Sequence, residues 1–295
     1  MTGWTIQTLR DLDLRYAEEG LHPHQRSFHA ARDILGDRFA IGVGGNPEVE
    51  RITTAYEAML PESSATWPGM GTGIAAVVDQ VRRITAPVMF GTVRIPVWKG
   101  LGFDSDREWW TWCREDRQLA SRTCFAFADI LDLTYGLDDL KGSSGRGLPM
   151  WRMAASNVSD FANTLPSTFS VDSVVQPICL AVELSLKAAI VQGGEDPASF
   201  RKRGAEGHDL VRLASRVARE FPHRDDPQVS EISASMPRYV DSRYAPAGLT
   251  RLQVVRLALG AQFIAASSVR RHSARDLAAK MEQGGWPAPR PSPLT

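Results

Sequence analysis

The stretch RKRGAEGHDLVRL, residues 201–213, places Arg203 and His208 close enough to act as a catalytic pair, with four residues between them. Histidine titrates near neutrality and can remove a proton from a ribose 2′-hydroxyl. Arginine presents a planar fork of donors that can stabilise the charge developing on a phosphate group. Such a pair could cleave RNA without a metal ion. We therefore take Arg203 and His208 as candidate catalytic residues, and Arg201 and Lys202 as candidate phosphate contacts.

The same histidine has a structural interpretation. It stands where a helix is expected to begin, and its ring could bond to a backbone group or to an acid such as Glu183. Glu183 and Lys187 are four residues apart in an otherwise apolar helix, in the order that favours an ion pair. A pair that is partly buried there could hold His208 or Arg203. We assign Glu183, Lys187 and Asp209 to structural support.

A second basic segment, PRYVDSRYAP, contains the dipeptides Arg238-Tyr239 and Arg243-Tyr244. A guanidinium beside a phenol suits contact with phosphate or stacking on a base. It equally suits bracing of a loop before the last helix. All four residues are kept as candidate binding residues.

Other arginine and histidine combinations fit the catalytic pattern less well. Arg216 precedes His223 by the right interval, but His223 falls at an expected helix end. His272 directly follows Arg270 and Arg271, without the spacing. Such loose spacing is common by chance in a chain with many arginines.

A metal site has weak support from the sequence. LHPHQRSFH brings His22, His24 and His29 within eight residues, yet no cysteine or acid stands nearby at ligand spacing. We predict neither a metal site nor a cofactor.

Composition excludes an overall polycation, because the chain has 34 basic and 34 acidic residues. The charges are unevenly placed: residues 1–200 carry 18 basic and 25 acidic side chains, and residues 201–295 carry 16 and 9. This favours docking between the halves or solvated charge, with anion binding by the basic part as the alternative. The three cysteines, Cys113, Cys124 and Cys179, are not paired by spacing and indicate reduced thiols in the cytoplasm. No apolar run reads as a signal peptide or a membrane span, so no membrane partner is expected.

Hydrophobic periodicity predicts a mainly α protein. A helical domain over 1–136 includes a long helix at 104–136, and GMGTG (69–73) reads as a flexible entry to a helix. The β-branched segment 86–103 predicts a small irregular β element or a packed loop. The Gly- and Ser-rich segment 137–149 predicts a linker, and residues 150–275 predict a bundle of four or five helices. The Pro-rich tail, 276–295, is expected to be disordered.

Residues 150–275 resemble the HEPN superfamily through the order of their motifs. CLAVELSLKAAI (179–190) is followed by GHDLVRLASRVA (207–218), by RYVDSRYAP (238–246) and by a last long helix. The residues that carry the resemblance are Glu183, Leu184, Lys187, Ala188, His208, Asp209, Leu210, Leu213 and the two Arg-Tyr dipeptides.

The resemblance implies a helical bundle that pairs as a homodimer. Many members are metal-independent endoribonucleases or the toxins of toxin–antitoxin and defence systems, whereas others bind nucleotides or proteins. Catalytic members place an Arg, four to six further residues and a His in a cleft that the dimer completes. In this chain Gly204 follows Arg203 where a polar residue is usual, and the motif opens the middle helix of the bundle.

Three functions follow as hypotheses. The first is a HEPN-like ribonuclease of toxin or defence type with Arg203 and His208 as catalytic residues. The second is a non-catalytic HEPN-like module that binds a nucleotide or a protein. The third is a small-molecule or metal-dependent enzyme centred on the N-terminal domain, with the bundle as its dimerisation unit.

Overall fold

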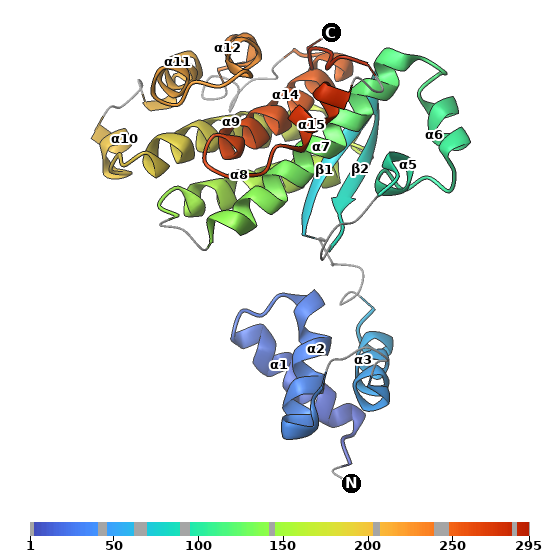
Figure 1. The fold of residues 1–295 in the computed structure, drawn as a ribbon. Helices are drawn as coiled ribbons and strands as arrows, with labels where there is room; N and C mark the ends of the chain where they lie inside the picture. Colours follow the sequence, from blue (N-terminus) through green and yellow to red (C-terminus); the bar gives the residue numbers. More distant parts are fainter. Residues whose placement is uncertain are drawn as a thin grey trace. The chain divides into compact units, whose positions relative to one another are not determined.

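The computed structural model describes residues 3–40, 46–61, 70–88, 95–141, 145–202, 207–238, 248–284 and 288–294, with only the backbone described for Arg201 and Lys202. The chain is mainly helical and has a small two-stranded antiparallel sheet, so the predicted fold class is confirmed. It divides into two compact units, Met1–Pro68 and Gly69–Thr295 (Figure 1). The composition predicted a domain boundary at 137–149, whereas the two units meet between Pro68 and Gly69.

In its described residues, unit 1 has three helices and a short 3₁₀ turn. These are α1 (Ile6–Glu18), α2 (Pro23–Leu35), η1 (Gly36–Arg38) and α3 (Pro47–Met59). Side chains cap two of the helices: Thr5 forms a capping box on α1, and Asn46 accepts from Glu48 N at α3. Their apolar faces meet in a core that includes Leu9, Ile52 and Tyr56.

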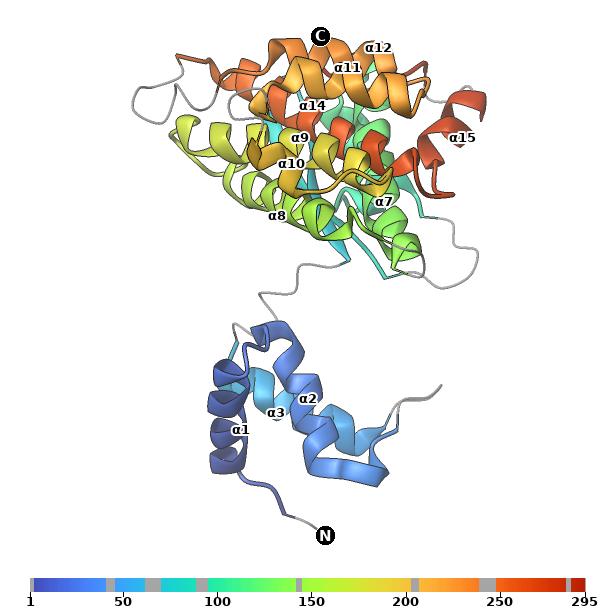
Figure 2. The same cartoon turned by 90° about the vertical axis from the view of Figure 1, so that its left-hand side faces the viewer.

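Unit 2 contains the sheet and the remaining helices. Its elements are β1 (Gly71–Val77), β2 (Gln80–Ala86), α5 (Val97–Gly100), α6 (Asp106–Trp112), α7 (Arg117–Leu140), α8 (Leu148–Thr164), α9 (Asp172–Gln192), α10 (Ala198–Lys202), α11 (Leu210–Glu220), α12 (Asp226–Ser235), α14 (Arg251–Arg270) and α15 (Leu277–Gly284). α7, α8, α9 and α14 form the centre, and α11 and α12 pack together over α9 and α14 (Figure 2). The hairpin packs against α7, α8 and α14.

The sheet lies earlier than the sequence predicted. Residues 71–86 form a hairpin rather than the start of a helix, with Gly71 opposite Ala86 and Val77 opposite Gln80. α7 crosses β1 so closely that a Cβ on Gly73 would stand 2.1 Å from Ile130 Cδ1. This close approach leaves no room for a side chain at Gly73, and the small residues of β1 allow it. Residues 97–100 of the expected β element are helical, and 89–94 lie outside the described residues.

The expected single helix over 104–136 is two helices. Helix α6 ends at Trp112 and α7 begins at Arg117, because Arg114 and Glu115 adopt positive φ angles of 57° and 56°. Asp116 then caps α7 by accepting from Gln118 N and Leu119 N at 2.7 and 3.0 Å. α7 packs on α14 and β1, which places it in unit 2 rather than in an N-terminal domain.

The C-terminal segment is packed where it is described, contrary to the expected disorder. α15 lies on α7, and Ser121 Oγ donates to the carbonyls of Ala288 and Pro289 at 3.0 and 3.2 Å. The Arg290 guanidinium pairs with Asp129 and lies 4.4 Å from the ring centroid of Phe263. These contacts hold the described part of the tail against unit 2, because Arg290 pairs with a buried acid and lies over an aromatic ring.

Two central helices, α9 and α14, are long and apolar enough to cross a membrane by length and composition. This differs from the sequence expectation that no run reaches that length. Most of each candidate span is buried inside unit 2, as in the core helix of a globular domain.

Candidate functional site

The structure brings Glu183, Lys187 and His208 together; the spacing predicted the Glu183–Lys187 pair, and contact with His208 was one of the alternatives. Glu183 on α9 is buried, with 4% of its side chain exposed, and its Oε1 accepts from Lys187 Nζ at 2.6 Å. His208 Nδ1 lies 3.0 and 3.1 Å from the two carboxylate oxygens of Glu183. The His208 side chain is 48% exposed, so a buried acid holds a ring that solvent can reach.

Asp209 positions this histidine by starting α11. Its side chain accepts from Arg212 N at 3.1 Å, which satisfies one of the free amides of the first turn. α11 then buries Leu210, Leu213, Ala214 and Val217 against α9 and keeps its basic residues on the other face. The amphipathic pattern of α11 therefore sets where His208 meets α9.

The candidate partner of His208 is not described. Arg203, Tyr239, Arg243 and Tyr244 lie outside the described residues, and so do the side chains of Arg201 and Lys202. The backbone of Arg201 and Lys202 forms the end of α10.

Arg238 is described and exposed, in the segment that follows α12. It precedes the undescribed residues 239–247, so its predicted role in binding stays a prediction.

A cavity of about 330 Å³ adjoins the Glu183 cluster. Its lining residues are Phe200, Gly207, Val211, Arg212, Leu213, Ser215, Arg216 and Arg219. Two links join it to the cluster: Gly207 directly precedes His208, and the ring centroid of Phe200 lies 5.3 Å from Lys187 Nζ. The sequence analysis named Arg216 without its neighbours, although arginines at 212, 216 and 219 of an amphipathic helix indicate a basic face.

The arrangement suits proton transfer beside an anion. A carboxylate that bonds to one ring nitrogen of a histidine orients the ring and stabilises its protonated form. Arginines at the cavity supply donors that match phosphate oxygens. These are the functional groups that acid–base chemistry on a phosphate ester needs.

The arginines and histidines of the other combinations pair with other residues. Arg216 pairs with Glu195 and Glu220 at 2.6 and 2.7 Å. His223 Nδ1 accepts from Asp225 N at 3.2 Å and lies in a separate polar network. No hydrogen bond or ion pair of the described residues joins Arg216 to His223, so the spacing between them carries no site.

His272 is held between the rings of Trp151 and Phe221, at centroid distances of 5.6 and 4.8 Å. Burial, together with the nearby Arg271, lowers the pKa of His272 to about 4. The unfolded chain takes up this proton at about pH 6.5. Its contribution to stability is therefore present above about pH 6.5 and is lost as the pH falls toward 4.

We expect His272→Gln to reduce the decrease in the free energy of unfolding that occurs on going from neutral to acid pH. Between about pH 7 and 4.5 the wild type should lose on the order of 1–2 kcal/mol more than the variant, after allowance for partial solvent screening. Urea unfolding of both proteins at the two pH values measures the difference. Parallel losses in the two proteins would contradict the assignment.

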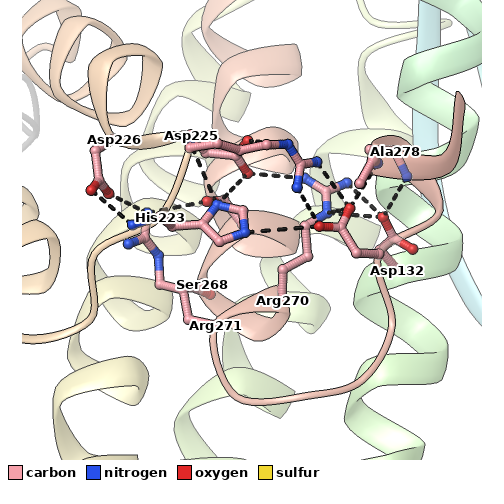
Figure 3. A network of polar contacts seen from close by, with 12 residues as sticks. Asp132, His223, Asp225, Asp226, Ser268, Arg270, Arg271 and Ala278 are labelled. Atoms are coloured by element: carbon pink, nitrogen blue, oxygen red, sulfur yellow. Dashed lines mark hydrogen bonds and ion pairs between the residues drawn. The ribbon is translucent and has the colours of Figure 1, made fainter. Parts of the chain in front are cut away.

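A network around Arg270 is the polar cluster that the sequence analysis missed (Figure 3). The guanidinium of Arg270 has no exposed area and contacts Asp129 at 2.5 Å, Asp132 at 2.8 Å, Asp225 at 3.4 Å and Asp276 at 3.6 Å. Asp132 also accepts from the amides of Leu277 and Ala278, at the start of α15. Acids spaced three apart in the apolar run FADILDL were the available signal, because a buried acid needs a partner.

This network ties elements together and is closed to substrate. It joins α7, α14, the start of α12 and the start of α15, and the side chains of Asp129 and Asp132 are almost fully buried. Arg224 extends it outward by pairing with Asp276 and, at 3.0 Å, with Glu282. The network therefore fixes α7, α12, α14 and α15 to one another.

The histidines of unit 1 do not form a metal site among the described residues. His22 and His24 approach with their Nδ1 atoms 2.6 Å apart, and burial and His22 lower the pKa of His24. No group of three or more His, Cys, Asp or Glu in the described parts of the chain is arranged to hold a metal ion. The three cysteines are buried, and burial raises the pKa of each thiol, to about 11 for Cys113 and about 12 for Cys124 and Cys179.

Comparison of the chain with protein-family models, with curated proteins and with solved structures found no match to any of them.

Proposed function

We propose that this chain is a HEPN-like, metal-independent endoribonuclease in which His208 is the general base. One observation carries the proposal: buried Glu183 holds the half-exposed ring of His208, and the preceding residue, Gly207, lines a cavity together with three arginines. A histidine that is oriented by an acid and remains open to solvent is suited to proton transfer, whereas a purely packing histidine is usually enclosed.

In the proposed reaction His208 removes the proton from a ribose 2′-hydroxyl. The resulting oxygen attacks the adjacent phosphorus and forms a 2′,3′-cyclic phosphate. The bond from phosphorus to the 5′-oxygen of the next nucleotide breaks, and that oxygen takes a proton from water and leaves as a hydroxyl. Glu183 fixes the ring and stabilises the imidazolium that forms. Lys187 holds Glu183 in place through the 2.6 Å ion pair. By resemblance, Arg203 supplies the cation that stabilises the phosphorane.

The resemblance also supplies the setting of the proposal. It supports a homodimer that completes the cleft, a role in a toxin–antitoxin or defence system, and action in the cytoplasm on cellular RNA. Three of the residues that carry it, Glu183, Lys187 and His208, contact one another in the fold.

The alternative is a non-catalytic module that binds a nucleotide or a protein through the same surface. The cavity favours it, because an anion could occupy that space without any proton transfer. Cleavage distinguishes the two functions.

The test is RNA cleavage by the full chain in EDTA. His208→Ala is expected to lower the cleavage rate by about 100-fold or more. His29→Ala, in unit 1, is the matched control and should cleave like the wild type. Circular dichroism of each variant checks that the fold is intact.

Two outcomes would overturn the proposal: an inactive wild type, or a His208→Ala variant that cleaves at the wild-type rate. Glu183→Gln gives a further readout, because loss of the orienting charge should move the pH–rate profile as well as lower the rate. A change in rate with an unmoved profile would count against Glu183 as the group that orients the base.

A further inference from the structure

Phe200 contacts the Glu183 cluster from a second helix. Its ring comes from α10, the short helix that follows α9 at one end of unit 2 (Figure 1). The ring centroid lies 5.3 Å from Nζ of Lys187, within the ~6 Å over which an aromatic face attracts a cation. Phe200 and Lys187 are 6% and 7% exposed, so the contact is made largely out of water. A desolvated ammonium gains more from an aromatic face than an exposed one does.

Lys187 connects this ring to the acid that holds His208. Its Nζ donates to Oε1 of Glu183 at 2.6 Å, and the same oxygen lies 3.0 Å from Nδ1 of His208. One carboxylate oxygen is therefore shared by the lysine and the histidine. Phe200, Lys187, Glu183 and His208 thus form a series of direct contacts, in which the position of the ammonium fixes the carboxylate and the carboxylate fixes the ring.

The contact with Glu183 also decides which nitrogen of His208 reacts. An ionised carboxylate only accepts hydrogen bonds, so the hydrogen of the neutral imidazole belongs on Nδ1. The lone pair of the neutral ring is then on Nε2. Nε2 is accordingly the atom that takes the proton from the 2′-hydroxyl in the proposed reaction. The groups that hold Glu183 against Nδ1 therefore select the reactive tautomer.

We propose that Phe200 is a positioning residue for the His208 base and acts through Lys187 and Glu183. The ring keeps the ammonium on Glu183, and the acid keeps the hydrogen of His208 on Nδ1. For the reaction itself this rests on the proposed function, whereas the tautomer can be measured without RNA. Without the phenyl ring, Lys187 should spend part of its time away from Glu183, and fewer molecules then hold the reactive tautomer.

The first test is a nitrogen NMR spectrum of the imidazole rings of the full chain at about pH 8.5, above the ordinary titration range of histidine. His208→Ala identifies the signals of His208. The wild type should be mostly in the Nδ1–H form, and Phe200→Leu should lower the ratio of Nδ1–H to Nε2–H by about fivefold, the size expected for a buried cation–π contact. Phe200→Tyr keeps an aromatic face and should restore the ratio, and a Tyr variant that behaves like Leu would contradict the proposal.

Phe161→Leu is the matched control, because it makes the same change at a buried phenylalanine of the same core. Gly147, just before α8, lies so close to α9 that a Cβ there would stand 2.4 Å from the carbonyl oxygen of Ala188. Phe161 is near the other end of α8, roughly 20 Å along the helix from that point. The control should lose packing and keep the wild-type ratio of tautomers. An equal fall in the ratio in both Leu variants would mean general loosening and would overturn the proposal.

Cleavage kinetics test the consequence for the reaction. Phe200→Leu should lower kcat by about fivefold and change KM by less than about twofold, because it acts on the base rather than on the binding of RNA. Lys187→Met tests the route. In a Lys187→Met background, Phe200→Leu should have no further effect, since two changes that act through one contact do not add. Additive losses would overturn the route through Lys187.

The positioning of His208 and the cleavage of RNA are tested separately. A wild-type ring in the Nε2–H form, or a ratio of tautomers that is the same in Phe200→Leu, would overturn the positioning role whether or not RNA is cleaved. A wild type that leaves RNA intact, with a ratio that falls in Phe200→Leu, would overturn the ribonuclease and leave Phe200 as the residue that positions the ring.

Discussion

Replacing Arg270 with methionine is expected to lower the free energy of unfolding by about 3–5 kcal/mol at neutral pH. The guanidinium of Arg270 has no exposed area and lies among Asp129, Asp132, Asp225 and Asp276. Methionine matches the apolar stem but leaves these carboxylates facing one another without their shared cation. The loss is large because uncompensated charge in a buried site is far more costly than a missing packing contact.

Urea unfolding of the wild type, Arg270→Met and Arg152→Met measures this effect. Arg152 is an exposed arginine on α8, so its replacement should change stability by less than about 0.5 kcal/mol. An Arg270→Met protein as stable as the control would show that the other cations of the network suffice.

Acid should partly rescue the Arg270→Met variant. Burial already raises the pKa of Asp132 in the wild type. Without Arg270, the pKa values of the neighbouring acids should rise too. For Asp225, burial is outweighed by a bond from His223 and by Arg270, and its pKa lies well below its usual range. Wild-type Asp225 therefore stabilises the fold above about pH 4 and loses this effect as the pH falls further.

In the variant, the effect of pH on the stability contributed by these acids reverses its sign. A pKa that is higher in the folded than in the unfolded state makes the folded state bind more protons. Its stability deficit should then shrink as the pH falls from about 7 to about 5. Unfolding curves across this window test the sign, and a deficit that is constant or grows would contradict the account.

Replacing Gln262 with leucine is expected to lower the free energy of unfolding by about 2–4 kcal/mol. The Gln262 amide accepts from Ile74 N at 2.8 Å and donates to Ile74 O at 3.1 Å, and it also donates to Ala126 O at 2.9 Å. It completes the edge of β1 that faces α14 and ties that edge to α7. Leucine of similar size would leave the buried amide and carbonyl of Ile74 without these partners.

Amide hydrogen exchange checks the site of this loss as well as its size. Exchange at Ile74 N should accelerate in Gln262→Leu, whereas Gln283→Leu, at an exposed position on α15, should leave it unchanged. Wild-type protection at Ile74 in a destabilised Gln262→Leu protein would place the effect elsewhere.

Much of the Glu183 cluster was predictable, because several of its features depend on residues close together in the sequence. A Glu and a Lys four apart on a helix face the same way, and an Asp before an apolar run caps the helix that it opens. Their contacts with one another and with His208 needed one further fact, that α11 packs on α9. The cavity was not predictable, because Phe200 on α10 lines it together with residues of α11.

The hairpin shows where local pattern misleads. Gly71 and Gly73 before IAAVV read equally well as a flexible entry to a helix or as a strand that packs closely. Ile130 on α7 and Gln262 on α14 decide in favour of the strand, since both crowd the position where a side chain at Gly73 would stand. The break before Asp116 was equally hidden, because Arg114 and Glu115 take positive φ without a glycine to signal it.

The sequence by itself determined the helical class, the helix start next to His208 and the ion pair on α9, because these depend on residues within one or two turns. Only the tertiary structure decided which charges are shared. Arg270 bonds to Asp132 and Asp129 across 138 and 141 residues of chain, and no local spacing encodes such a contact. The packing of the tail also depends on contacts that are distant in sequence. Arg290 pairs with Asp129 on α7 and lies over the ring of Phe263 on α14. A buried charge needs a partner of opposite charge, and the tertiary packing determines which residue that partner is.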